Sequence, residues 1–306
     1  MKAVQDLTTT TPTQTDIDKA NQAFWNEMCG STFAQYLGIT EHTQESLQAF
    51  DQGYLGLYPY LLDYIRPQEL SGKRVLEIGL GYGTVSQTLI DHGALYTGLD
   101  IAEGPVNLVR ERLRFQGIEG NVIQGSMLNC PLPDESVDCV ISIGCFHHTG
   151  NTQRCIDEAY RILKPGGRAT IMLYNRFSLR QWLRWPLSTA KAMANDLLIG
   201  NYKLTSNTDQ KWAYDYNSQG EAAPETEFFS QKQVKALFRQ FSSVQCALEN
   251  IDDYIVQFKP PLIITNNRLK RNKHGNVLPL HLIQRDKALL TWGKTMGLDI
   301  YIEAYK

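Results

Sequence analysis

The sequence predicts an open, doubly wound α/β fold, in which helices cover both faces of a mostly parallel sheet. Short apolar runs alternate with amphipathic segments from residue 74 to residue 174, and this alternation is typical of parallel sheets. A glycine-rich turn directly follows the first apolar run, as expected where a strand passes straight into a helix. Both observations favour a ligand site at the carboxyl ends of the strands.

The elements follow one another with ordinary spacing. Strands are expected at 74–79, 95–100, 121–125, 137–144 and 168–174, with helices at 83–92, 103–116 and 152–163 between them. Beyond this block, 177–198 reads as a helix that Pro186 interrupts, and 201–226 reads as a polar loop. Ser230 is a candidate helix cap, and the last strands are expected at 243–248 and 297–304.

The first turn carries the strongest functional signal. Gly79, Gly81 and Gly83 alternate with single residues, whereas a dinucleotide-binding turn has the spacing Gly-x-Gly-x-x-Gly. Asp100 ends the second strand, where an acid accepts hydrogen bonds from a ribose diol. Glu77 suits a cofactor that carries an ammonium group, such as S-adenosylmethionine (SAM). Taken singly, the glycines could form an ordinary turn and Asp100 could cap a helix, but a buried, unpaired Glu77 would be costly.

Five segments in this order resemble the class I SAM-dependent methyltransferases. They are 74–83, 95–100, 121–127, 132–149 and 163–171, and the resemblance spans about residues 73 to 175. It implies a seven-stranded sheet with an antiparallel sixth and seventh strand. Ser126 departs from the family, which commonly has Asp at the adenine contact. The resemblance implies a SAM site formed by Glu77, Gly79, Gly81, Gly83, Thr84, Asp100, Ile101, Ser126, Met127, Gly144 and Cys145.

Composition excludes few classes of function. The chain has 306 residues and a formal net charge of −2, so it has no overall electrostatic drive toward nucleic acid. Its six cysteines show no metal-ligand or Cys-x-x-Cys spacing, so no metal site is expected. The threonine-rich start lacks the apolar core of a signal peptide, and no apolar run is long enough to span a membrane. A cytoplasmic protein is therefore expected.

The segments outside the core are expected to recognise the acceptor. We expect disorder at 1–15, a helical lid at 16–70, the SAM-binding core at 71–175 and acceptor-covering elements at 176–306. The lid includes a helix from Asp16 and one over 54–65, and offers Trp25, Tyr54 and Tyr58 as acceptor contacts. Arg176, Arg180 and Arg184 share a helix face that could bind an anionic acceptor, lie against a membrane or simply be solvated.

A long insertion, 251–296, precedes the last strand and contains the basic run 268–273. It is expected to cover the substrate or to form a homo-oligomer. His147 and His148 follow the fourth strand and are the candidate general bases, although histidines at this place can also be structural.

The predicted activity is therefore transfer of a methyl group from SAM to a small-molecule acceptor at O, N or C, leaving S-adenosylhomocysteine. Alternatives are methylation of RNA or protein and a non-catalytic SAM-binding module.

Overall fold

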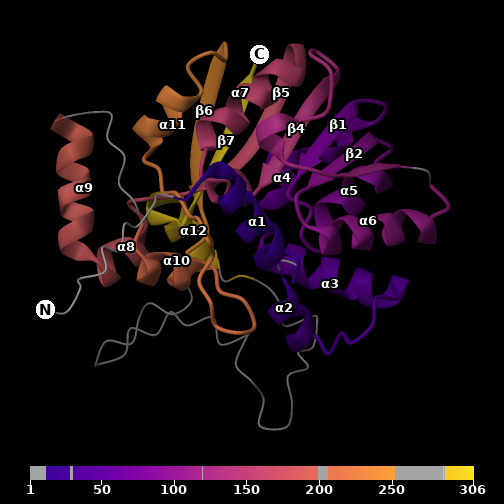
Figure 1. Ribbon diagram of the computed structural model, residues 1–306, viewed down its shortest axis with the longest axis horizontal. Coiled ribbons are helices and arrows are strands. Elements are labelled where there is room, and N and C mark those ends of the chain that lie inside the picture. The colour runs from indigo at the N-terminus through magenta and orange to yellow at the C-terminus, as the bar shows by residue number, and fades with distance from the viewer. Residues whose placement is uncertain (1–11, 28–29, 119, 199–205, 252–284, 286) are drawn as a thin grey trace, which may run out of the picture.

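A computed structural model describes residues 12–27, 30–118, 120–198, 206–251, 285 and 287–306. Its centre is one seven-stranded sheet with the strand order β3-β2-β1-β4-β5-β7-β6 (Figure 1). The first five strands are parallel, and β7 runs antiparallel to both β5 and β6. The predicted fold, including the antiparallel final pair, is confirmed. The strands are β1 (Arg74–Ile78), β2 (Leu95–Asp100), β3 (Asn121–Gln124), β4 (Val137–Ile143), β5 (Leu163–Tyr174), β6 (Ser243–Glu249) and β7 (Asp299–Tyr305).

The strands are buried on both faces because neighbouring side chains point to opposite sides. On β1, Leu76 joins one buried cluster and Val75 joins the other. Helices α7 (Thr152–Ile162) and α11 (Gln231–Leu237) cover the Leu76 side, whereas α4 (Leu61–Ile65), α5 (Thr84–Asp91) and α6 (Glu103–Phe115) cover the Val75 side. This two-faced burial explains why the strands read as continuous apolar runs.

The N-terminal segment, for which a lid is predicted, contains α1 (Gln14–Trp25), α2 (Ser31–Tyr36), α3 (Gln44–Leu57) and α4. Helix α1 begins two residues before the predicted start, inside the segment expected to be disordered, because Thr13 and Asp16 form a reciprocal cap. The predicted helix over 54–65 is wrong. Helix α3 ends at Leu57 and α4 starts at Leu61, with Pro59, which has no amide hydrogen to donate, between them. Residues 1–11 lie outside the described residues.

The region after β5 contains α8 (Leu179–Arg184) and α9 (Pro186–Leu198), separated at Trp185 as Pro186 predicts. The expected loop over 201–226 is wrong in part, because α10 (Thr208–Tyr214) lies within it, capped by Asn207 and Gln210. Helix α12 (Lys287–Met296) leads into β7, while most of the predicted insertion, with its basic run, is outside the described residues. No helix in the described part of the chain has the length and apolarity to cross a bilayer.

Candidate cofactor and acceptor site

The turn between β1 and α5 forms a cradle that a side chain would fill. Gly79 has φ +79°, and a Cβ on it would lie 2.5 Å from the Cβ of Cys145. Gly83 also has a positive φ and precedes the first turn of α5. The glycines therefore let the backbone pass beneath the start of the loop after β4, at the carboxyl edge of the sheet.

Asp100 ends β2 beside this turn. Its Oδ2 accepts a hydrogen bond from the Leu80 amide and its Oδ1 one from the Ala102 amide, each at 2.8 Å. Burial raises the pKa of Asp100 to about 6, against the effect of these backbone hydrogen bonds. The ionised carboxylate keeps spare lone pairs on both oxygens, so it can also accept hydrogen bonds from a pair of hydroxyls. This pair of acceptor oxygens fits the ribose hydroxyls of a nucleoside cofactor.

Glu77 is buried beneath α5. Its Oε2 accepts hydrogen bonds from the Ser86 hydroxyl at 2.6 Å and the Tyr96 hydroxyl at 2.7 Å. Burial raises the pKa of Glu77 to about 7, although these two hydrogen bonds favour its charged form. The structure thus gives this acid two partners within the fold, and its predicted contact with an ammonium group stays a prediction.

A buried ion pair, not foreseen from the sequence, joins helix α3 of the N-terminal segment to α6 beside the glycine turn. Arg112 of α6 contacts both carboxylate oxygens of Asp51 in α3, at 2.8 and 2.9 Å, and also donates to the Tyr82 carbonyl. The Thr84 hydroxyl donates to the same Asp51 at 2.7 Å. Thr84, expected at the cofactor, therefore also joins α3 to α5. No local motif links Asp51 and Arg112, which are 61 positions apart.

The remaining predicted cofactor residues border the same edge. Ser126 accepts a weak hydrogen bond from the Leu128 amide at 3.3 Å, and its hydroxyl proton can still be donated. Met127 next to it is buried. Gly144, with φ +81°, and Cys145 follow β4, while Ile101 follows Asp100.

His147 and His148 lie in the short helical turn after β4 and are both buried. Neither ring nitrogen of His147 has a hydrogen-bond partner among the described residues. In His148, Nδ1 lies 2.7 Å from the Glu225 carbonyl, which can only accept, so Nδ1 carries a proton and Nε2 is left with its lone pair. Burial lowers the pKa of both histidines, and for His148 the nearby Asp215 carboxylate opposes this effect.

Asp215 is the partner of His148 that the sequence did not reveal. Its Oδ2 lies 3.6 Å from Nε2 of His148 and accepts a hydrogen bond from the Tyr174 hydroxyl at 3.1 Å. Burial raises the pKa of Asp215, while His148 and Tyr174 act in the opposite direction. Asp215 follows α10, in the segment expected to be a loop, and no motif marked it. His148, Asp215 and Tyr174 thus form a buried cluster of ionisable groups at the ends of β4 and β5.

The predicted lid residues fall into different places. The Trp25 ring packs against the His148 ring with centroids 4.7 Å apart, and Asn21 of the same helix donates to the His148 carbonyl. Tyr54 and Tyr58 instead pack on each other near β7. Arg176 donates to the Phe228 carbonyl at 3.0 Å. Of the predicted acceptor residues, Trp25 is thus the one placed against a candidate base.

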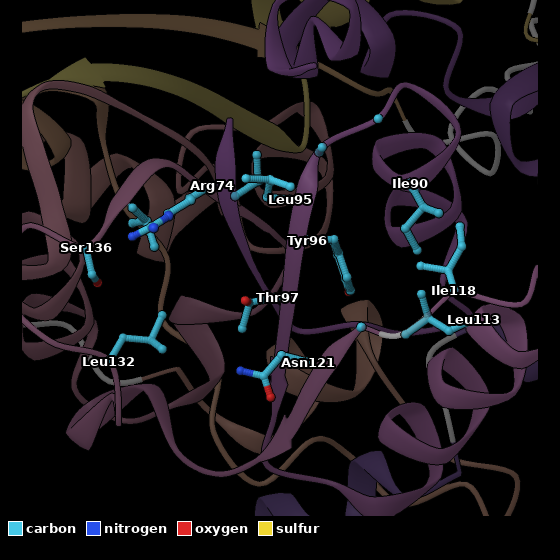
Figure 2. A pocket seen from close by; sticks show the side chains of 15 residues that line it. Arg74, Ile90, Leu95, Tyr96, Thr97, Leu113, Ile118, Asn121, Leu132 and Ser136 are labelled. Carbon is cyan, nitrogen blue, oxygen red and sulfur yellow. The ribbon is translucent and has the colours of Figure 1, made fainter. Parts of the chain in front are cut away.

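A cavity of about 590 Å³ lies at the opposite edge of the sheet (Figure 2). Figure 2 shows Ile90, Leu113 and Ile118 on one side of β2, with Leu132 and Ser136 on the other. The strands begin at this edge, so the cavity is remote from the glycine turn. Its lining is mainly apolar and holds no group of catalytic residues, which makes it a poor candidate for the reaction site.

Comparison with known proteins supports the assignment of the core. Residues 76–171 match the family model described as a methyltransferase domain. A demethylmenaquinone methyltransferase from Tropheryma whipplei is 33% identical over 147 residues, which cover 45% of this chain and 60% of that protein. A phthiotriol/phenolphthiotriol dimycocerosates methyltransferase from Mycobacterium tuberculosis is 36% identical over 103 residues, 32% of this chain and 37% of that protein.

The fold also has a counterpart among solved structures. A SAM-dependent methyltransferase from Archaeoglobus fulgidus aligns with a TM-score of 0.50 and 16% identity, over 82% of this chain and 93% of that one. This similarity concerns the fold alone. The matched family model identifies residues 76–171 as a methyltransferase domain, and the glycine cradle and Asp100 lie within it.

Proposed function

We propose that the chain transfers a methyl group from SAM to a small-molecule acceptor. The observation that carries this proposal is that the glycine cradle and the candidate base lie next to each other. Cys145 packs against the cradle, and His148 follows Cys145 by three residues. Asp215 contacts His148 from a distant part of the chain. A cofactor lying on the cradle would thus face the loop that carries the candidate base.

The proposed cofactor contacts divide among three loops. The backbone at Gly79, Gly81 and Gly83 accommodates the methionine portion, and Asp100 accepts from the ribose hydroxyls. Ser126 and Met127 border the adenine. Thr84, Ile101, Gly144 and Cys145 complete the walls of the site, and Glu77 supports the turn from below and supplies negative charge near the ammonium group.

The proposed acceptor lies over the ends of β4 and β5, beneath α1. Aromatic rings line this region: Trp25 packs on His148, and Tyr174 stacks near Phe228 with centroids 6.1 Å apart. The two relatives are named for demethylmenaquinone and for phthiotriol dimycocerosates, which supports a small-molecule acceptor. Because this chain covers under two thirds of each, neither acceptor is assigned to it.

The residues of this chain orient the acceptor and take up its proton. When bound, SAM supplies an activated methyl group and its own leaving group, so no nucleophilic side chain is required. We assign Nε2 of His148 as the proton acceptor, because the Glu225 carbonyl fixes the tautomer of the ring and burial lowers its pKa, which favours the neutral form. Asp215 then stabilises the imidazolium, while Tyr174 orients Asp215. His147 packs between the rings of His148 and Tyr174 and has a supporting role.

Turnover of SAM in the presence of quinols, phenols and amines tests this proposal, with S-adenosylhomocysteine as the readout. The expected result is acceptor-dependent product formation that His148→Gln lowers by about 10²–10⁴-fold, the usual contribution of a general base. SAM binding without turnover on any acceptor would instead favour a binding module. Turnover on RNA with a strong salt dependence would favour a macromolecular acceptor.

A further inference from the structure

Helices α8 and α9 carry a row of exposed leucines on their outer side. In Figure 1, α9 stands at the margin of the molecule, next to α8. Its inner side is buried through Thr189, Ala192 and Asp196, which are spaced three and four residues apart. The outer side presents apolar side chains that are 46%, 87%, 74% and 85% exposed: Leu183, Leu187, Leu197 and Leu198. An exposed apolar row of this kind marks an interaction surface.

The charge of this surface has a single sign. Residues 176–198 contain three arginines and one lysine but one acid, Asp196. That acid is buried and accepts a hydrogen bond from the Ser230 hydroxyl at 2.7 Å. Arg184 and Lys191 are exposed, so the outer side of the two helices is apolar and positive, in a chain whose net charge is −2. A partner for it must accept leucines and supply negative charge.

We propose that the outer face of α8 and α9, formed by the four leucines with Arg184 and Lys191, docks on an anionic lipid bilayer. The leucines enter the boundary between headgroups and acyl chains, and the two cations pair with lipid phosphates. A 13-residue helix is about 20 Å long, so α9 lies in the plane of the interface and does not cross it. A second copy of the chain fits this face less well, because the same positive charges would meet with no exposed acid to offset them.

The docking face is connected to the carboxyl ends of β4 and β5, where the candidate base lies. Helix α8 begins just after β5, and the Ser178 hydroxyl that precedes it lies 2.9 Å from the Tyr214 hydroxyl, next to Asp215. Docking would therefore set the acceptor side of the fold close to the bilayer. The statement about the acceptor side rests on the proposed function, whereas docking itself is tested without the reaction.

Co-sedimentation with vesicles tests the proposal without any acceptor or turnover. Vesicles of phosphatidylcholine with phosphatidylglycerol are compared with vesicles of phosphatidylcholine alone. The wild-type chain is expected to sediment with the first and far less with the second. Leu187→Gln with Leu198→Gln is expected to weaken binding at least tenfold, and Arg184→Gln with Lys191→Gln about fivefold per charge, with a smaller salt dependence.

Matched controls come from exposed residues elsewhere. Leu95 is 57% exposed at the far edge of the sheet, and Arg114 is exposed on α6, so Leu95→Gln and Arg114→Gln are expected to bind as wild type. Unfolding temperatures check that all variants fold. Absence of wild-type binding to the anionic vesicles would overturn the proposal. Unchanged vesicle binding by Leu187→Gln with Leu198→Gln would also overturn it. So would a wild-type dimer that these two substitutions dissociate while vesicle binding persists.

Discussion

Asp215 faces Nε2 of His148 at 3.6 Å across the ends of β4 and β5, and the Tyr174 hydroxyl holds the same carboxylate. The Glu225 carbonyl accepts a hydrogen bond from the other ring nitrogen, Nδ1. The imidazole is therefore fixed from both sides by residues that are 67 and 77 positions away in the sequence. Its environment determines both its tautomer and the stability of its charged form.

Replacing Asp215 is expected to lower the pKa of His148 further. The carboxylate favours the imidazolium, so Asp215→Asn removes the largest of the effects that oppose the desolvation of the buried ring. A titration of the His148 ring by ¹⁵N NMR measures this shift directly. Asp209→Asn on the exposed start of α10 is the control, and a His148 pKa that rises or stays constant in Asp215→Asn would contradict the assigned pairing.

Gly79→Ala is expected to destabilise the fold more than Gly220→Ala does. Both glycines have φ +79°, so the backbone strain is the same, about 1–2 kcal/mol. A Cβ at Gly220 meets nothing within 4 Å, whereas one at Gly79 meets Cys145 at 2.5 Å. The difference in unfolding free energy, measured by urea denaturation, should reach about 1–3 kcal/mol. Equal losses would mean that the cradle is not closed by Cys145.

The affinity for SAM is expected to fall as the pH drops through about 6. In the proposed site Asp100 accepts hydrogen bonds from the ribose in its ionised form, and burial raises its pKa to about 6. Calorimetric titrations between pH 5 and 8 measure this dependence. Asp100→Asn should bind more weakly at pH 8 and lose most of the dependence, and a wild-type affinity that is constant over this range would contradict the assigned contact.

The stability of Glu77→Gln relative to wild type is expected to rise with pH. The folded-state pKa of Glu77, about 7, is raised above its ordinary value of 4.5, so the native state binds more protons than the unfolded state between these values. Its contribution to stability is therefore complete below pH 4.5 and is lost as the pH rises through 7. The stability of Glu77→Gln relative to wild type should increase from pH 5 to pH 8, by about 1–3 kcal/mol. Exposed Glu103→Gln serves as the control, and a difference that does not vary with pH would refute the buried titration.

Local signals explain which parts of the fold could be predicted. The strands and the glycine turn are written in contiguous residues, so β2 was predicted with its bounds and most other core elements to within a residue or two. The first residues of β5 lie outside the predicted strand. There Leu163 pairs with Val137, the register is irregular, and Pro165 and two glycines follow. The break before Leu61 depends on the single residue Pro59 within an aromatic stretch, and helix α10 depends on the Asn207 cap within a polar one.

The site could be predicted less completely, because its partners come from distant elements. Gly79 and Asp100 are recognisable from spacing along one strand-helix-strand unit. Asp51 and Asp215 gain their roles from contacts with Arg112 and His148 that tertiary packing creates. Neither acid stands in a repeated pattern, so no reading of the local sequence distinguishes it from a solvated carboxylate.

Calorimetric titration of the purified chain with SAM and, separately, with NAD is the most direct test of the central claim. SAM binding in the micromolar range is expected, weakened by about 1–3 kcal/mol in Asp100→Ala because hydrogen bonds to a charged group are lost. The exposed Asp209→Ala variant should bind as wild type. If wild-type protein binds NAD in place of SAM, or binds neither, the assignment of the glycine cradle to SAM is contradicted.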